Sequence, residues 1–133
     1  MKKKFSLLLA LVLILGMSMQ ANAQNARSVS LGNCYISIGI QSNGVSLSYT
    51  TNCTDSASVI GCKDIVLEEK VNGSWRSISI PGTSTTNAYS HSGSGVYTGA
   101  VKGRSYRAHC THYAIYGGVT YTLYNDTDVL VYN

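Results

Sequence analysis

The sequence predicts an all-β domain, an antiparallel sandwich of about seven strands, preceded by a cleavable signal peptide. Three observations support this prediction. Apolar and polar residues alternate along most of the chain, and no stretch keeps apolar residues at helical spacing over several turns. Turn dipeptides recur at intervals that suit a β-sandwich. Residues 1–23 have the composition of an export signal.

The N-terminal segment contains the three parts of a signal peptide. Lys2–Lys4 form a positive start, Phe5–Met17 form an apolar run, and Ala21–Ala23 form a small-x-small cleavage pattern. The run is shorter than the roughly 20 residues of a membrane-spanning helix. We therefore expect cleavage after residue 23, which leaves 24–133 as one secreted, extracellular domain without a stable membrane anchor.

The net charge of +4 belongs mostly to this leader. Three of the ten Lys and Arg residues lie at positions 2–4, so seven remain against six Asp and Glu in the expected mature chain. The clustered cations that bind nucleic acid are missing, and nucleic acid is not an expected partner. The low charge also disfavours a secreted toxin or antimicrobial factor, which we keep as an alternative.

The first predicted hairpin turns at Asn43-Gly44, a dipeptide that favours a two-residue type I′ turn. In that register Ile40 faces Leu47, and Cys34 faces Cys53. Facing residues have Cα atoms about 4.5–5.5 Å apart, which is within the reach of a disulfide.

All four cysteines lie beyond the expected cleavage site, and an even number in an exported domain predicts two disulfides. The hairpin favours Cys34–Cys53 with Cys62–Cys110, and the alternative is Cys53–Cys110 with Cys34–Cys62. Cys62 has the opposite strand parity to Ile65. Its bridge to Cys110 therefore requires a bulge or a loop near Gly61.

A second hairpin is predicted at Asn72-Gly73. It places Glu69 opposite Arg76 and Lys70 opposite Trp75, whose ring can support the lysine stem and its charge. We interpret Trp75 as cover for a sheet edge rather than as a platform for a ligand.

The third and longest hairpin, over Tyr106–Val131, turns at Gly117-Gly118. One face of its first strand is more apolar and is expected to look inward: Tyr106, Ala108, Cys110, His112, Ala114 and Tyr116. On the outer face, Arg107 is expected opposite Asp128 and His109 opposite Asp126. The segment that begins at Gly103 also resembles the start of a late sandwich strand, where a tyrosine hydroxyl closes the corner.

The outer face of this hairpin is the candidate ligand-binding surface. Tyrosine offers a large contact area at low entropy cost, and the chain has ten tyrosines. The alternative interpretation is that tyrosine replaces phenylalanine in a small core. We predict a non-catalytic binding module for a carbohydrate or a surface protein, with these contact residues: Tyr113, Tyr124, Thr111, Thr122 and His109.

Other arrangements are less suited to chemistry. His109 and His112 are three apart on a strand and so point to opposite faces, which disfavours a metal site with the intervening Cys110. Glu68 and Glu69 point apart as strand neighbours and cannot flank one glycosidic bond. The sequence lacks a nucleophile elbow, a phosphate loop and a zincin motif. We predict no enzyme, metal or cofactor; a small secreted hydrolase with an unrecognised site is the alternative.

Five segments of the mature chain share their pattern with a known group of proteins. They are Ile60–Ile65, Val71–Trp75, Ser90–Gly93, Gly103–Ala108 and Tyr113-Ala114. In these segments the chain resembles short secreted proteins of unknown function from Gram-positive gut bacteria. The resemblance implies an immunoglobulin-like β-sandwich and supplies no catalytic residues.

Overall fold

The computed structural model describes residues 30–133, so the predicted signal peptide lies outside the described residues. These residues form seven antiparallel strands and no helix, and thus none that could cross a membrane. The all-β class and the number of strands are confirmed. The strands are β1 (Tyr35–Gln41), β2 (Gly44–Val71), β3 (Ser74–Ile80), β4 (Thr83–Tyr97), β5 (Ser105–Tyr116), β6 (Val119–Asp126) and β7 (Leu130–Val131).

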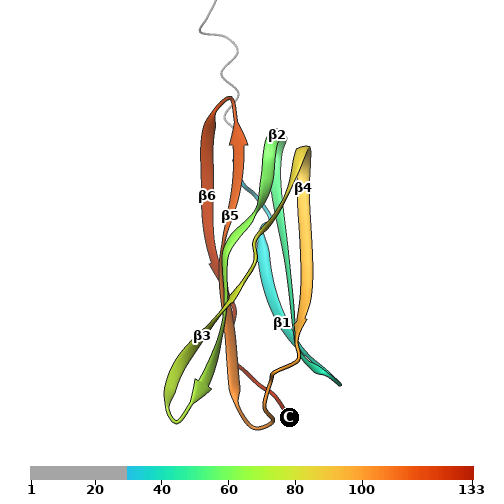
Figure 1. Ribbon diagram of the computed structural model, residues 1–133. Coiled ribbons are helices and arrows are strands. Elements are labelled where there is room, and N and C mark those ends of the chain that lie inside the picture. Colours follow the sequence, from blue (N-terminus) through green and yellow to red (C-terminus); the bar gives the residue numbers. More distant parts are fainter. Residues whose placement is uncertain (1–29) are drawn as a thin grey trace, which may run out of the picture.

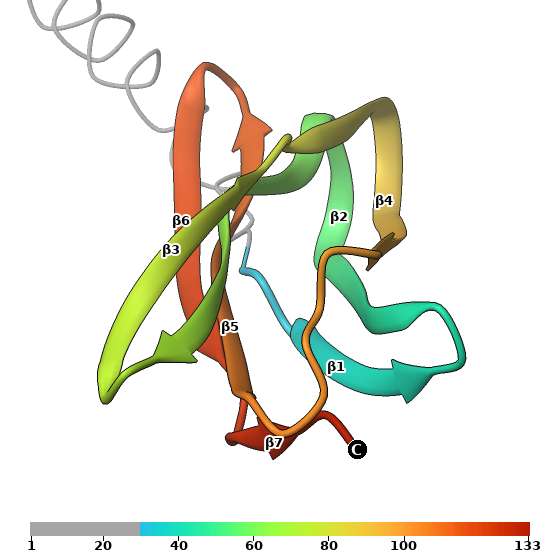
Figure 2. The same ribbon diagram turned by 60° about the horizontal axis from the view of Figure 1, so that its bottom comes forward.

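All seven strands belong to one sheet that curls into a half-barrel (Figures 1 and 2). The 28-residue strand β2 is central to this sheet and pairs with four other strands. Its first part pairs with β1 and β4, and its last part pairs with β3 and β5. A strand this long twists strongly, so the sheet rotates as its partners change. The two-layer sandwich is therefore corrected to one curled sheet, because turn spacing predicts strands but not how they divide between sheets.

The first hairpin differs from its prediction by two residues. Ile38 rather than Ile40 pairs with Leu47, and the bend lies at Ser42-Asn43. Because the shift is even, the same sets of side chains still face the core.

Gly44 explains this shift. It is the first residue of β2, and a Cβ there would lie 2.1 Å from the carbonyl oxygen of Tyr97 in β4. The glycine therefore serves the close approach of β4 instead of the turn. As a result, Cys34 no longer faces Cys53, which forms an isolated bridge with Leu31.

The second hairpin is confirmed. Asn72 and Gly73 have φ values of 50° and 82°, as a type I′ turn requires. The register pairs Glu69 with Arg76 and Lys70 with Trp75, and the Lys70 Nζ lies 5.6 Å from the centre of the Trp75 ring.

The third hairpin is also confirmed in register, from Tyr116 opposite Val119 to His109 opposite Asp126. Buried residues alternate along β5 as predicted: Tyr106, Ala108, Cys110, His112 and Ala114. Tyr116, at the turn, is only half-buried.

The predicted pairing of Arg107 with Asp128 is wrong. Strand β6 ends at Asp126, and Arg107 instead pairs across the sheet with Glu68 of β2. Its Nε lies 2.5 Å from the Glu68 carboxylate, and its guanidinium lies 4.1 Å from the centre of the Trp75 ring.

A β-bulge places Cys62 in the core. The sequence predicted a bulge or loop near Gly61 as the condition for bringing Cys62 close to Cys110. The register of β2 against β5 shifts between Lys63 and Val66, and Asp64 has a φ of 50°. The extra residue reverses the alternation, so that Cys62 and Ile65 are both buried.

Tyr106 closes a corner at the start of β5, as the sequence predicted. Its hydroxyl accepts a hydrogen bond from the Val101 amide (2.8 Å) and donates one to Glu69 (2.9 Å). The fully buried Glu69 carboxylate also accepts from Arg76 and Arg104, at 3.0 and 2.7 Å.

His91 in β4 provides a pH test of the fold. Burial lowers its pKa below 6.5, and its ring nitrogens hydrogen-bond the hydroxyls of Thr83 and Thr85, each at 2.7 Å. The folded state favours the neutral imidazole, so this stabilisation is complete above about pH 6.5 and is lost as the pH falls through the lowered pKa. We expect the free energy of unfolding to fall less between about pH 7 and pH 5 in His91→Gln than in the wild type, as measured by urea denaturation. Parallel profiles for the two proteins would contradict this.

Candidate functional site

The five predicted contact residues lie on the outer face of β5 and β6. Thr111 pairs with Tyr124, and Tyr113 pairs with Thr122. On β5 they alternate with the buried residues and are half-buried, whereas Tyr124 is 63% exposed. The proposed face therefore exists as a surface, and His109 lies on it.

The two tyrosines of this face have different neighbours. The Tyr124 and His109 rings have centroids 5.7 Å apart. Tyr113 instead lies near the Lys63 Nζ, which is 5.4 Å from its ring centre. Tyr124 is thus the more open ring, with an aromatic neighbour on one side.

A polar pocket of about 460 Å³ opens beside Tyr124. It includes His109 but not Thr111, Tyr113 or Thr122, so the hollow lies at one end of the predicted face. The sequence did not predict this pocket, although the pairing of His109 with Asp126 placed two of its lining residues side by side. The lining residues are Glu68, Arg107, Ala108, His109, Tyr124, Asp126, Thr127, Asp128 and Val129.

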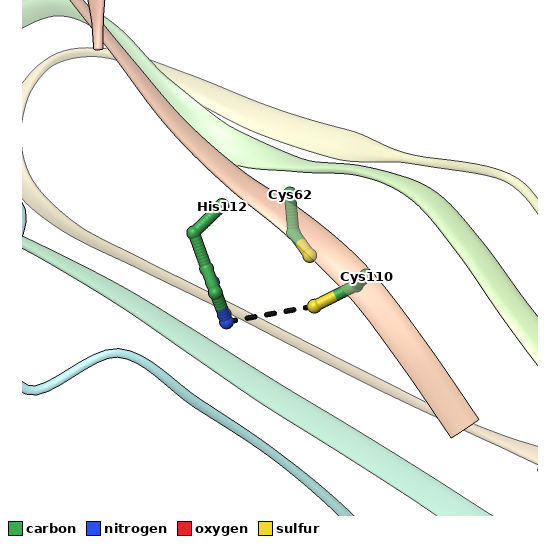
Figure 3. A group of neighbouring side chains, drawn as sticks. All are labelled: Cys62, Cys110 and His112. Carbon is green, nitrogen blue, oxygen red and sulfur yellow. Dashed lines mark hydrogen bonds between the residues drawn. The ribbon is translucent and has the colours of Figure 1, made fainter. Parts of the chain in front are cut away.

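A second group of functional side chains lies inside the curled sheet. Within residues 30–133, one group of three potential metal ligands comes together: Cys62, Cys110 and His112 (Figure 3). Their ligand atoms lie within 4.8 Å of one another, and the Cys110 Sγ is 3.5 Å from the His112 Nε2. All three residues are buried.

The other nitrogen of His112 is held by the buried Thr51. The Thr51 hydroxyl lies 3.0 Å from the Gly61 carbonyl oxygen and 2.6 Å from the His112 Nδ1. A carbonyl can only accept, so Thr51 donates its single proton to Gly61 and accepts from the Nδ1–H. In a neutral imidazole, the Nε2 then carries its lone pair toward Cys110.

The two buried thiols are not equivalent. The Cys62 thiol donates to the Cys110 sulfur, and this hydrogen bond raises the pKa of Cys62 and lowers that of Cys110. Of the two sulfurs, Cys110 is therefore the one that ionises more readily.

The structure contains neither of the predicted disulfides, since no two of the four cysteines lie at disulfide distance. For Cys34–Cys53, the cause is the two-residue shift of the first hairpin. The Cys34 sulfur instead contacts the backbone nitrogen and oxygen of Asn52, at 3.4 and 3.5 Å. Cys62 and Cys110 do come close, but Cys62 is directly opposite His112, which leaves Cys110 as its diagonal neighbour.

Strand parity correctly predicted the opposite directions of the two histidines but not the full cysteine–histidine cluster. His109 faces outward and His112 faces inward, as parity required. Cys110 shares the inner face with His112, however, and the bulge adds Cys62 from a different strand. That third residue could not be read from the local sequence.

Comparisons with known proteins find no match for this chain. No family model matches the sequence, and neither curated proteins nor solved structures do. The resemblance to short secreted proteins from Gram-positive gut bacteria therefore stays a prediction.

Proposed function

We propose that this protein is an exported, non-catalytic binding module that recognises a carbohydrate at the polar pocket beside Tyr124. One observation supports this function above others: a 63% exposed aromatic ring forms a wall of a pocket that is rich in charged side chains. An isolated exposed tyrosine is common on protein surfaces, whereas an exposed tyrosine that lines a polar pocket is typical of a binding site.

The combination suits the two surfaces of a sugar ring. The C–H face of a pyranose is apolar and packs on a flat aromatic ring, whereas its hydroxyl edge needs donors and acceptors. Here the Asp126 and Asp128 carboxylates supply acceptors, and Arg107 supplies a donor. The ring of His109 supports Tyr124 from one side.

The rest of the predicted face extends the site along the hairpin. Thr122 lies two residues before Tyr124 on the same face of β6, and Tyr113 lies opposite Thr122. Tyr113, Thr111 and Thr122 would then contact further sugar units of an oligosaccharide. This arrangement favours a short oligosaccharide that lies along β6.

The test is retention on a glycan array, with Tyr124→Ala as the variant. We expect an affinity loss of at least about tenfold, or about 1.4 kcal/mol, because the stacking surface is removed. Tyr89→Ala is the matched control, since Tyr89 is 60% exposed on β4 and is not part of the pocket.

Three outcomes would refute the proposal. The first is equal retention of the wild type and Tyr124→Ala on the array. The second is that the module binds a protein ligand but no glycan, and the third is release of free sugar from a bound glycan. The last outcome would instead support the hydrolase alternative, with the pocket carboxylates as its catalytic groups.

A further inference from the structure

We propose that Cys62, Cys110 and His112 bind one thiophilic metal ion, of the Zn²⁺ or Cu⁺ type, inside the curled sheet. The inference is independent of the carbohydrate site, which lies on the outer face. It rests on the convergence of three ligand atoms, on the orientation of the imidazole and on the burial of the group (Figure 3).

The spacing of the ligand atoms is close to what a metal needs. Zinc binds sulfur at about 2.3 Å and nitrogen at about 2.0–2.1 Å, so two ligands of a tetrahedral ion are about 3.4–3.8 Å apart. The Cys110 Sγ and His112 Nε2 are 3.5 Å apart, and all three ligand atoms lie within 4.8 Å.

The imidazole is oriented for coordination before any ion arrives. Thr51 accepts from the Nδ1–H of His112 and is itself fixed by the Gly61 carbonyl. This leaves the Nε2 lone pair facing the Cys110 sulfur, 3.5 Å away. An outer hydrogen bond that sets the tautomer is the usual companion of a metal-binding histidine.

The donor set and the burial select the ion. Two sulfurs and one nitrogen suit soft ions and exclude Ca²⁺ and Mg²⁺, which need oxygen ligands. With a neutral imidazole, two thiolates and Zn²⁺ have no net charge, as a buried site favours. Cu⁺ leaves one negative charge but also accepts soft sulfur ligands. Binding involves no redox change: two metal–sulfur bonds and one metal–nitrogen bond form, and the two thiol protons leave to solvent.

The main competing state is a disulfide between Cys62 and Cys110. These residues are diagonal neighbours, because Cys62 pairs with His112. Diagonal neighbours are typically about 7–8 Å apart, whereas the Cα atoms of a disulfide are usually about 4.4–6.8 Å apart. A metal ion suits the longer separation, because two metal–sulfur bonds take the place of the single S–S bond.

The test is metal binding by the purified protein, reduced with a thiol-free reductant and titrated with Zn²⁺ and Cu⁺ in separate arms. We expect one ion per chain by native mass spectrometry in at least one arm. We also expect thiolate-to-metal charge-transfer absorption with Co²⁺ as a probe of the zinc site. Binding in one arm only identifies the ion and supports the site.

Variants locate the ion. Cys110→Ser and His112→Gln should lose stoichiometric binding, while the double variant Cys34→Ser/Cys53→Ser keeps it as the matched control. Thr51→Val should lower the metal affinity by about 10- to 100-fold, because the His112 imidazole loses the hydrogen bond that orients it. This variant keeps all three ligands, so it tests the site even if the ligand variants do not fold.

A further measurement uses the unmodified protein. Bound metal should raise its melting temperature. The proposal is overturned if the reduced protein binds neither ion, if the control double variant loses the ion, or if peptide mapping shows a Cys62–Cys110 disulfide in the protein as isolated.

Discussion

Replacement of Glu69 by alanine will lower the free energy of unfolding by about 3 kcal/mol or more. The carboxylate is fully buried and accepts hydrogen bonds from Arg76, Arg104 and Tyr106. Its removal leaves a cavity and takes away the acceptor of the buried Tyr106 hydroxyl. The two arginines are partly exposed and can be hydrated again, so the loss falls at the low end of the range for broken buried ion pairs.

The adjacent Glu68 is the matched control for this experiment. It points to the other face of β2 and pairs with the partly exposed Arg107. The Glu68 side chain is 17% exposed and has a single ion-pair partner in the described structure, so Glu68→Ala should cost only about 1 kcal/mol. Urea denaturation of both variants measures the difference. Equal losses of unfolding free energy would show that the hydrogen bonds to Glu69 do not stabilise the corner at Tyr106.

Gly61→Ala is expected to destabilise the protein by about 3 kcal/mol. Gly61 lies in β2 where that strand is paired on both edges, with Ser84 of β4 and Tyr113 of β5. A Cβ at this position would lie 2.4 Å from the carbonyl oxygen of Thr83 and 2.9 Å from the Cα of Ser84. These are backbone atoms, so the strands must separate to accept a methyl group.

The control is Gly95→Ala in β4, where a Cβ meets no atom within 4 Å. Its free energy of unfolding should stay within about 0.5 kcal/mol of the wild type. The comparison isolates the close approach of β4 to β2 from the general effect of replacing a strand glycine. A Gly61→Ala protein as stable as Gly95→Ala would contradict the packing described here.

Local sequence patterns predicted two of the hairpins correctly for a physical reason. Asn72-Gly73 and Gly117-Gly118 adopt the left-handed conformations that their residue types favour, and a two-residue turn then determines every facing pair. Gly44 was misassigned because a glycine can serve a turn or a close contact. The contact with Tyr97 depends on a strand far along the chain.

The candidate sites were predictable to different degrees. Alternation alone placed His109 and Tyr124 on the outer face of the last hairpin. The pocket beside them was not predictable, because it depends on where β6 ends and on Glu68 from β2. The inner cluster needs the bulge at Asp64, which alternation along a single strand cannot reveal.

By itself, the amino-acid sequence determined the all-β class, the number of strands and the side of the last hairpin on which each residue lies. These properties follow from alternation and turn chemistry, which act between near neighbours. The tertiary structure decided the curl of the sheet, the sharing of β2 among four partners and the meeting of Cys62 with Cys110 and His112. They depend on twist, on a bulge and on contacts between distant segments, whose energies no short stretch of sequence contains.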